Sequence, residues 1–247
     1  MFGWWRRRGR QAVVDAAGFA RPLEKVPALS GLDAARRAHL RDLAGRFLRD
    51  KHFSGAHGLV VDAGMRSTIA TLACWPVLDL GYDWLTGWCE VIVYPGGFRA
   101  RRVHDDEDGV VHEWDEDLAG ESWDRGPLVL SWEDLELDLE QPQDCMNVVV
   151  HEIAHKLDAR SGAADGMPPL PRSIRVSEWQ REFQRAYEHL GEIAGRDPDA
   201  ALIDPYAADA PEEFFAVCSE YHFLAPERIE AAYPRVADLL ARFYAGG

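Results

Sequence analysis

The stretch V-V-V-H-E-I-A-H-K-L-D, residues 148–158, constrains the fold more than any other part of the 247-residue chain. The three valines before the first histidine, and the isoleucine, alanine and leucine after it, predict a helix apolar enough to be buried. Residues four apart lie on one face of a helix, so His151 and His155 point the same way, with Glu152 beside them. Histidines and a glutamate inside a core need polar partners. The chain must therefore fold so that other segments bury this helix and supply hydrogen-bond partners or charges to its histidines and glutamate.

The pattern H-E-x-x-H is typical of a metal-dependent hydrolase. Two neutral imidazoles four residues apart can hold Zn²⁺, which lowers the pKa of a bound water towards neutrality. Glu152, which does not bind the metal, can take the proton of that water. In a chain with nine histidines the pattern arises by chance in roughly a few per cent of sequences, so a satisfied polar cluster is the alternative. The apolar surroundings favour the metal, because a metal supplies the partner that a buried cluster needs.

A catalytic zinc needs a third protein ligand, which must come from elsewhere in the chain. A third histidine in the continuation H-E-x-x-H-x-x-G-x-x-H is absent, because K-L-D-A-R-S-G follows His155. A glutamate from a later helix is the usual alternative, and residues 203–223 offer Glu212, Glu213 and Glu220. Glu213 and Glu220 would lie two turns apart on one helix face, whereas Glu212 points about 100° away. Spacing alone does not decide between Glu213 and Glu220.

Helical and strand-like segments follow one another in an order that predicts an α+β fold. A helix is expected in the segment S-G-L-D-A-A-R-R-A-H-L-R-D-L-A-G-R-F-L, where Ser30 and Asp33 are capping candidates. Its apolar residues Leu40, Leu43 and Phe47 recur at helical spacing. Strands are expected at G-L-V-V-D, E-V-I-V-Y-P and G-P-L-V-L-S-W, which Gly and Pro bound. Further helices are expected at residues 144–158, 173–190, 211–223 and 234–244.

Composition and charge argue against several partners. The formal net charge of −15 argues against nucleic acid, because phosphate contacts need clustered Lys and Arg, which occur here only in W-W-R-R-R-G-R near the start. No membrane partner is expected, since no uncharged run approaches the roughly eighteen residues that span a bilayer. The absence of a secretion signal and of C-x-x-C pairs favours a reducing cytoplasm. Residues 1–20 are expected to form a flexible tail and residues 21–247 a single domain.

The motifs quoted above resemble those of a known family. H-E-I-A-H-K-L-D, followed about fifty residues later by I-D-P-Y-A-A-D-A-P-E-E-F-F-A-V-C-S-E-Y, is similar to the MtfA family of zinc peptidases. The likeness extends upstream through P-V-L-D-L-G-Y-D-W-L-T-G-W-C-E-V-I-V-Y-P and covers most of residues 30–245. In its catalytic core that family resembles the anthrax lethal-factor type of metallopeptidase. The resemblance implies a zincin-like metallopeptidase domain, with a small sheet packed against a helical half that carries the H-E-x-x-H helix.

The resemblance also assigns site residues. In that family the two motif histidines and the glutamate of a P-x-E-x-F-A-V segment hold the metal, with a tyrosine seven residues before that glutamate. Carried over, the ligands of one Zn²⁺ per chain are His151, His155 and Glu213. The catalytic residues are then Glu152 as base and Tyr206 as hydrogen-bond donor to the oxyanion. Pro205 and Pro211 predict that a helix starts after Tyr206, so that the tyrosine approaches from a loop.

Three further carboxylates near the site have open roles. Asp158, three residues after His155, is expected either to accept a hydrogen bond from an imidazole or to lie at the surface where the helix ends. Glu220 is expected to orient a ligand or to be a satisfied core carboxylate, with metal binding as the other alternative. Glu212 is expected to be an exposed carboxylate in the first turn of its helix.

Two functions from different classes are compatible with these residues. The first is a zinc-dependent peptidase, with aminopeptidase or limited endopeptidase activity on a peptide or protein substrate. Pro127–Trp132 would be the edge strand that pairs with the substrate, or else a core strand. The second is a regulatory protein that sequesters a transcriptional repressor, because the founding member of the family binds the glucose-system repressor Mlc. A base and a tyrosine beside the ligands favour catalysis, since a structural zinc needs only a closed set of ligands.

Overall fold

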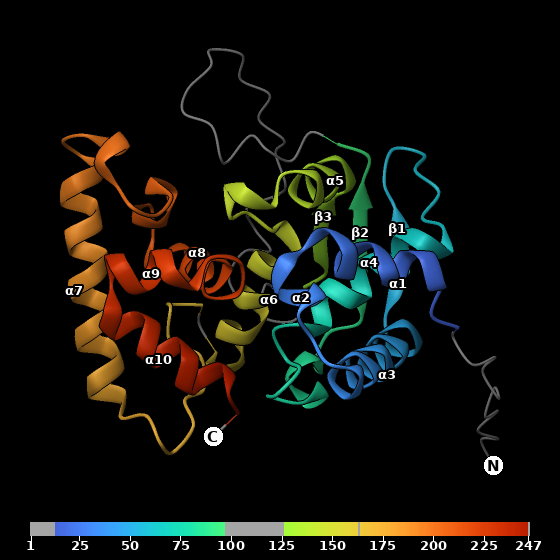
Figure 1. The fold of residues 1–247 in the computed structure, drawn as a ribbon, viewed down its shortest axis with the longest axis horizontal. Coiled ribbons are helices and arrows are strands. Elements are labelled where there is room, and N and C mark those ends of the chain that lie inside the picture. Colours follow the sequence, from blue (N-terminus) through green and yellow to red (C-terminus); the bar gives the residue numbers. More distant parts are fainter. Residues whose placement is uncertain (1–12, 97–125, 163, 247) are drawn as a thin grey trace.

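The computed structural model describes residues 13–96, 126–162 and 164–246, and its helices and strands form the expected α+β fold (Figure 1). Helix α6 (Val148–Asp158) lies between a part that contains the sheet and a part that contains only helices. It contacts α4 and β3 on one side and α8 on the other. The helix that carries both motif histidines is therefore enclosed by segments from both parts of the chain.

Within the ranges given above, the sheet has three short parallel strands. They are β1 (His52–Gly55), β2 (Glu90–Tyr94) and β3 (Leu128–Ser131), in the order β1-β2-β3. His52 lies opposite Glu90 in the first pair, and Val91 lies opposite Leu128 in the second. Among the described strands, β3 is thus at one end of the sheet, and it is the strand that α6 packs against.

In the described ranges, five helices share this part of the molecule with the sheet. They are α1 (Ala16–Lys25), α2 (Pro27–Ser30), α3 (Ala34–Asp50), α4 (Ala63–Cys74) and α5 (Trp132–Glu140). Helix α3 confirms the helix expected there: the Asp33 side chain accepts a hydrogen bond from the Arg36 amide, and the three apolar residues Leu40, Leu43 and Phe47 are buried. Helices α1 and α3 both pack on α4, so this core consists largely of helix against helix.

Two strand predictions need correction. The segment G-L-V-V-D is not a strand: Gly58 has a φ of +83°, Val60 is 82% exposed, and the Asp62 side chain caps α4 by accepting from the Met65 amide. The strand lies a few residues earlier, at β1, directly after α3. A Cβ on Gly55 would meet the carbonyl oxygen of Leu59 at 1.9 Å, which shows how tightly the chain turns there. In the third predicted strand Trp132 is not extended but begins α5, because the Ser131 side chain caps that helix.

The helical part confirms three of the expected helices. They are α7 (Val176–Ala194), α8 (Pro211–Leu224) and α10 (Pro234–Tyr244), and the short α9 (Pro226–Ala232) lies between the last two. Proline occupies the first position of α8, α9 and α10, where its missing N–H costs no intrahelical bond. Aromatic side chains join these helices: the rings of Trp179 and Phe183 stack with centroids 4.1 Å apart, and both contact Phe215 of α8.

Helix α6 begins later than the sequence indicated. The predicted helix from residue 144 is replaced by a 3₁₀ turn at Pro142–Asp144 and by Cys145 in a left-handed conformation with φ +58°. Asn147 then caps α6 by accepting a hydrogen bond from the Val150 amide at 3.0 Å. The first histidine therefore lies in the first turns of a capped helix.

The start of the folded chain also differs from expectation. Residues 1–12 lie outside the described residues, but α1 already begins at Ala16, and its Phe19 is buried. The folded domain therefore begins before residue 21, because helix α1 already starts at Ala16. In the three described ranges no helix combines the length and the apolar character that crossing a bilayer requires.

Candidate metal centre

Helix α6 presents His151 and His155 from one face. Its other face is fixed in the core by five fully buried apolar side chains: Val149, Val150, Ile153, Ala154 and Leu157. Burial of each larger side chain contributes about 1.5–3 kcal/mol, so the helix has little freedom to rotate. His151 is 4% exposed, and the centroids of the two imidazole rings are 4.8 Å apart. The two Nε2 atoms point toward each other at 3.1 Å.

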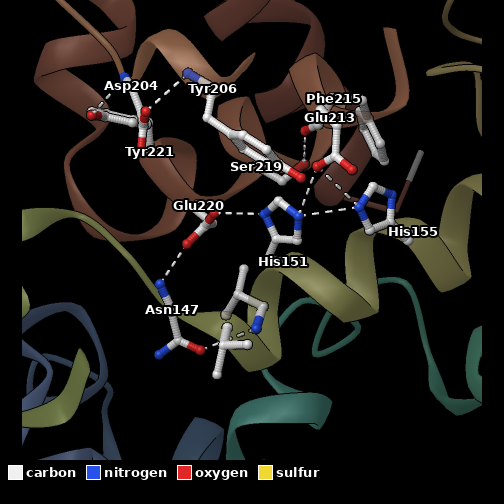
Figure 2. A network of polar contacts seen from close by, with 12 residues as sticks. Asn147, His151, His155, Asp204, Tyr206, Glu213, Phe215, Ser219, Glu220 and Tyr221 are labelled. Carbon is white, nitrogen blue, oxygen red and sulfur yellow. Dashed lines mark hydrogen bonds and ion pairs between the residues drawn. The ribbon is translucent and has the colours of Figure 1, made fainter. Parts of the chain in front are cut away.

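Glu213 approaches these nitrogens from the first turn of α8 (Figure 2). Its Oε2 lies 3.1 Å from Nε2 of His151 and 3.5 Å from Nε2 of His155. Ligand atoms of these three residues all lie within 4.8 Å of one another. The structure thus brings together the three residues that were expected to hold a metal, although 62 positions separate His151 from Glu213.

Glu220, two turns further along α8, fixes the orientation of His151. Its Oε1 lies 2.7 Å from Nδ1 of His151, and its Oε2 accepts the backbone N–H of Asn147 (Figure 2). A carboxylate beside Nδ1 favours the tautomer in which Nδ1 carries the proton, which leaves a lone pair on Nε2. Of the alternatives stated for Glu220, orientation of a histidine agrees with this geometry. Metal binding does not, because the Glu220 oxygens contact Nδ1 of His151 and the Asn147 amide rather than the converging Nε2 atoms.

The atoms that converge here are suited to a cation. With the proton of His151 on Nδ1, its Nε2 lone pair faces another imidazole nitrogen and a carboxylate oxygen. Three acceptor atoms at such distances repel one another unless a proton or a metal ion lies between them. Two imidazoles and one carboxylate form a donor set that divalent zinc accepts, and a tetrahedral ion would keep a fourth position for water or substrate. The residues present therefore fit a catalytic metal.

The electrostatic surroundings keep Glu213 ionised. Burial of its side chain favours the neutral acid, but in the metal-free site an imidazole of His151 or His155 that carries a proton on the nitrogen facing Glu213 outweighs burial and holds the pKa of Glu213 below its usual range. Its position in the first turn of α8 adds the favourable end of the helix dipole. An ionised carboxylate is the form that binds a metal.

The two residues expected to take part in catalysis come from the elements that carry the ligands or precede them. Glu152 follows His151 on α6 and is partly exposed, so water can reach it. Tyr206 lies on the 3₁₀ turn Pro205–Ala208, ahead of α8, which confirms that it approaches from outside the helix. The ring of Tyr206 lies with its centroid 6.3 Å from that of His151, and Figure 2 shows its hydroxyl end directed toward the side where Glu213 lies.

Asp158 differs from both expectations. It is fully buried, so placement at the surface was wrong. Its carboxylate accepts a hydrogen bond from the amide of Gly166 at 2.7 Å, not from an imidazole. Its other oxygen has no hydrogen-bond partner among the described residues. Burial raises the pKa of Asp158 to about 7, although hydrogen bonding from Gly166 partly opposes this. Glu212 is partly rather than fully exposed, and it is not among the atoms that converge on the site.

Sequence reasoning missed two groups that shape the site. Tyr221, next to Glu220 on α8, accepts a hydrogen bond from the backbone of Asp204, just before the turn that carries Tyr206. The Lys156 ammonium donates to the carbonyl oxygen of Gly126 at 2.9 Å, just before β3. Tyr221 could have been suspected, since it lies two turns after Glu213 on the helix that supplies this expected ligand. Nothing in the sequence indicated the contact of Lys156.

Two histidines of one helix that meet a carboxylate of another are typical of a metal-dependent hydrolase. Comparison with known proteins agrees. The chain belongs to the family described as glucose-regulated metallo-peptidase M90, whose model matches residues 2–245. The protein is a member of a metallopeptidase family, as the resemblance of its motifs implied.

Curated relatives share the family and cover most of the chain. Mlc titration factor A of Klebsiella pneumoniae (strain 342) is 40% identical over 223 residues, which are 89% of this chain and 82% of the relative. The protein of the same name from Escherichia coli O9:H4 (strain HS) is 39% identical over the same shares. That from Yersinia pestis (strain Pestoides F) is 36% identical over 222 residues, 89% of this chain and 81% of the relative.

Proposed function

We propose that this protein is a zinc-dependent peptidase that hydrolyses peptide bonds, with aminopeptidase or limited endopeptidase activity. The observation that carries the proposal is the meeting of the two Nε2 atoms and the Glu213 carboxylate, with the outer nitrogen of His151 occupied by Glu220. Membership of a metallopeptidase family supports the reaction class. Two imidazoles and one carboxylate are a ligand set that catalytic zinc uses in peptidases, and the family is one of metallopeptidases, which favours zinc here.

In this proposal His151, His155 and Glu213 hold one zinc ion per chain. When bound, zinc polarises the scissile carbonyl and lowers the pKa of a coordinated water towards neutrality. Glu152 accepts the proton of the attacking water and passes it to the amine that leaves. The Tyr206 hydroxyl, neutral at pH 7, donates a hydrogen bond to the negative charge that develops on the carbonyl oxygen. The proposal thus assigns metal binding to the two imidazoles and one carboxylate, proton transfer to a second carboxylate, and hydrogen-bond donation to a phenol.

The substrate is expected to lie extended along β3. This strand ends the described sheet and packs directly against α6, so a peptide that pairs with the edge of β3 to which no described strand is bonded would run past the histidines. The contact from Lys156 to Gly126 ties α6 to the segment just before β3. Backbone pairing would align the substrate with little dependence on its side chains.

A second function is suggested by the names of the relatives. Proteins called Mlc titration factor A are named for an effect on Mlc, so binding of a transcriptional repressor is the alternative for this chain. In that case the metal centre would be secondary. Binding to purified Mlc from one of those organisms, measured with the parent and with Glu152→Gln, separates the two functions, because repressor binding alone does not need the base.

Location in the cytoplasm is part of the same proposal. All four cysteines, which are Cys74, Cys89, Cys145 and Cys218, are free thiols in the structure. Free thiols suit a reducing compartment.

The decisive experiment joins metal analysis to peptide cleavage. The purified protein is expected to contain about one zinc per chain, and to cleave some members of a panel of chromogenic peptides until a chelator removes the metal. Restored cleavage on addition of zinc completes the test. A protein that neither contains nor takes up zinc would contradict the proposal, as would a zinc-loaded protein inert to every peptide in a broad panel.

A further inference from the structure

Tyr221 is connected to Tyr206 through two consecutive hydrogen bonds. The amide of Asp204 donates to the Tyr221 hydroxyl at 3.1 Å. The side chain of Asp204 then accepts the amide of Tyr206 at 2.9 Å, and so caps the 3₁₀ turn that carries this tyrosine (Figure 2). The Tyr221 hydroxyl is thus hydrogen-bonded to Asp204, the residue whose side chain caps the turn that carries Tyr206.

Tyr221 is itself held firmly. It is 4% exposed and lies on α8, the helix that also supplies Glu213 and Glu220. The guanidinium of Arg228 lies over its ring, 5.0 Å from the centroid, and donates to the carbonyl oxygen of Leu202 at 3.1 Å. The phenol therefore presents its hydroxyl from a rigid helix to a short non-helical segment.

The hydrogen bonds within the turn fix its shape, and packing against α7 and α8 places it in the helical part. Within it, the amide of Ala207 donates to the carbonyl oxygen of Asp204, and the amide of Asp209 donates to that of Tyr206. These bonds move with the turn. The contacts of Tyr221 and Arg228 join the preceding residues to α8 and α9, so they add directed hydrogen bonds to that packing just before the turn.

We propose that Tyr221 is a positioning residue that holds the Tyr206 hydroxyl in place over the metal centre. The inference rests on the proposed function, in which Tyr206 donates a hydrogen bond during hydrolysis. Oxyanion donors must lie within a few tenths of an ångström of their working position, so a loosened turn weakens catalysis without weakening metal binding. One helix then supplies a metal ligand, the partner of another ligand, and the support of the catalytic tyrosine.

The test is a double-mutant cycle in the zinc-loaded protein. Tyr221→Phe removes one oxygen and keeps the ring, so it is expected to leave zinc content and KM unchanged and to lower kcat by roughly 3- to 10-fold, the usual range for one hydrogen bond. Tyr206→Phe is expected to lower kcat more. If Tyr221 acts through Tyr206, adding Tyr221→Phe to Tyr206→Phe causes little further loss. A general structural role would instead lower kcat by the same factor in both backgrounds and would overturn the proposal.

A matched control is available in Tyr233. Its hydroxyl also makes an intramolecular contact, to Nδ1 of His189 at 3.4 Å, but this contact joins α7 to the junction of α9 and α10 and does not involve Asp204 or Tyr206. Tyr233→Phe is expected to leave kcat, KM and zinc content unchanged. An equal fall in kcat for Tyr221→Phe and Tyr233→Phe would show that loss of any such hydroxyl matters, and would overturn the proposal.

Amide hydrogen exchange separates failure of this inference from failure of the proposed function. It needs no activity: in the metal-free protein, the amides of Asp204 and Tyr206 are expected to exchange faster in Tyr221→Phe than in the parent or in Tyr233→Phe. If the parent cleaves no peptide but this difference is seen, the proposed function fails and the placement of the turn by Tyr221 stands. Unchanged exchange at both amides would overturn the inference whatever the activity.

Discussion

Glu220 contacts the outer nitrogen of His151 at 2.7 Å while Glu213 contacts the inner one at 3.1 Å, so one imidazole is held between two carboxylates of the same helix. The second oxygen of Glu220 accepts the amide of Asn147, the cap of α6. Glu220 therefore joins α8 to the start of α6 and orients a metal ligand at the same time.

Glu220→Gln is expected to weaken zinc binding about 10- to 100-fold, as loss of such supporting contacts does. An amide offers one acceptor and one donor, so either Nδ1 of His151 or the Asn147 amide would face an N–H group. Competition with a calibrated chelator measures the affinity. Unchanged affinity would show that Glu220 does not orient the ligand.

Glu213→Ala is expected to lower zinc affinity more than Glu220→Gln does, because it removes a bond to the metal. The neighbouring Glu212→Ala is the matched control and is expected to change little, since Glu212 is not among the converging atoms. Zinc content after dialysis against a weak chelator compares the variants. Zinc retained in Glu213→Ala but lost in Glu220→Ala would move the third ligand two turns along α8.

Glu152→Gln is expected to retain zinc and to lower kcat by about 10²- to 10⁴-fold, because an amide cannot accept the proton of the attacking water. Glu192→Gln, an exposed change on α7, is the control for altered net charge. Steady-state cleavage and zinc content are measured on the same preparations. If Glu152→Gln cleaves as fast as the parent, another group is the base.

The buried carboxyl of Asp158 predicts a stability that depends on pH. Its pKa is raised to about 7, because burial favours the neutral acid, whereas the carboxyl of an unfolded Asp has its ordinary pKa of 3.8. Between these two values the folded state binds more protons than the unfolded state, so this group's contribution to stability falls as pH rises from about 4 to 7. Asp158→Asn cannot ionise and avoids this loss.

Relative to the parent, Asp158→Asn is therefore expected to gain roughly 1–3 kcal/mol in free energy of unfolding between pH 5 and pH 8. Urea unfolding in the presence of a chelator measures this without interference from metal binding. Asp199→Asn, at an exposed position, controls for the loss of a surface charge. A difference between variant and parent that is the same at both pH values would contradict the raised pKa.

Local signals in the sequence predicted the helices and the motif well. Asp33 caps α3, and Pro211 begins α8, because capping and proline geometry act within a few residues. The run G-L-V-V-D misled because strand formation depends on a partner, and in this fold β2 pairs with His52–Gly55 instead. The burial of Asp158 could not be foreseen either, since it depends on a loop that returns to bring Gly166 over the end of α6.

At the site the division is similar. Spacing on one helix placed His151 and His155 together, whereas the choice of Glu213 over Glu220 needed the resemblance to a family. The structure shows why spacing was insufficient: both glutamates contact His151, but at different nitrogens, and only Glu213 also contacts Nε2 of His155. The hydrogen bond from Asp204 to Tyr221 crosses between elements, so no local pattern encodes it.

The 62 positions between His151 and Glu213 have a consequence for the folding of the helical part. A metal ion bound by both would cross-link α6 to α8 and close a loop that contains the whole of α7. Such a link forms only when the helices are already packed, so the ion would stabilise the native state in proportion to its free concentration. Scarcity of metal would then shorten the lifetime of the folded protein as well as silence it, which would couple its abundance to the supply of the ion.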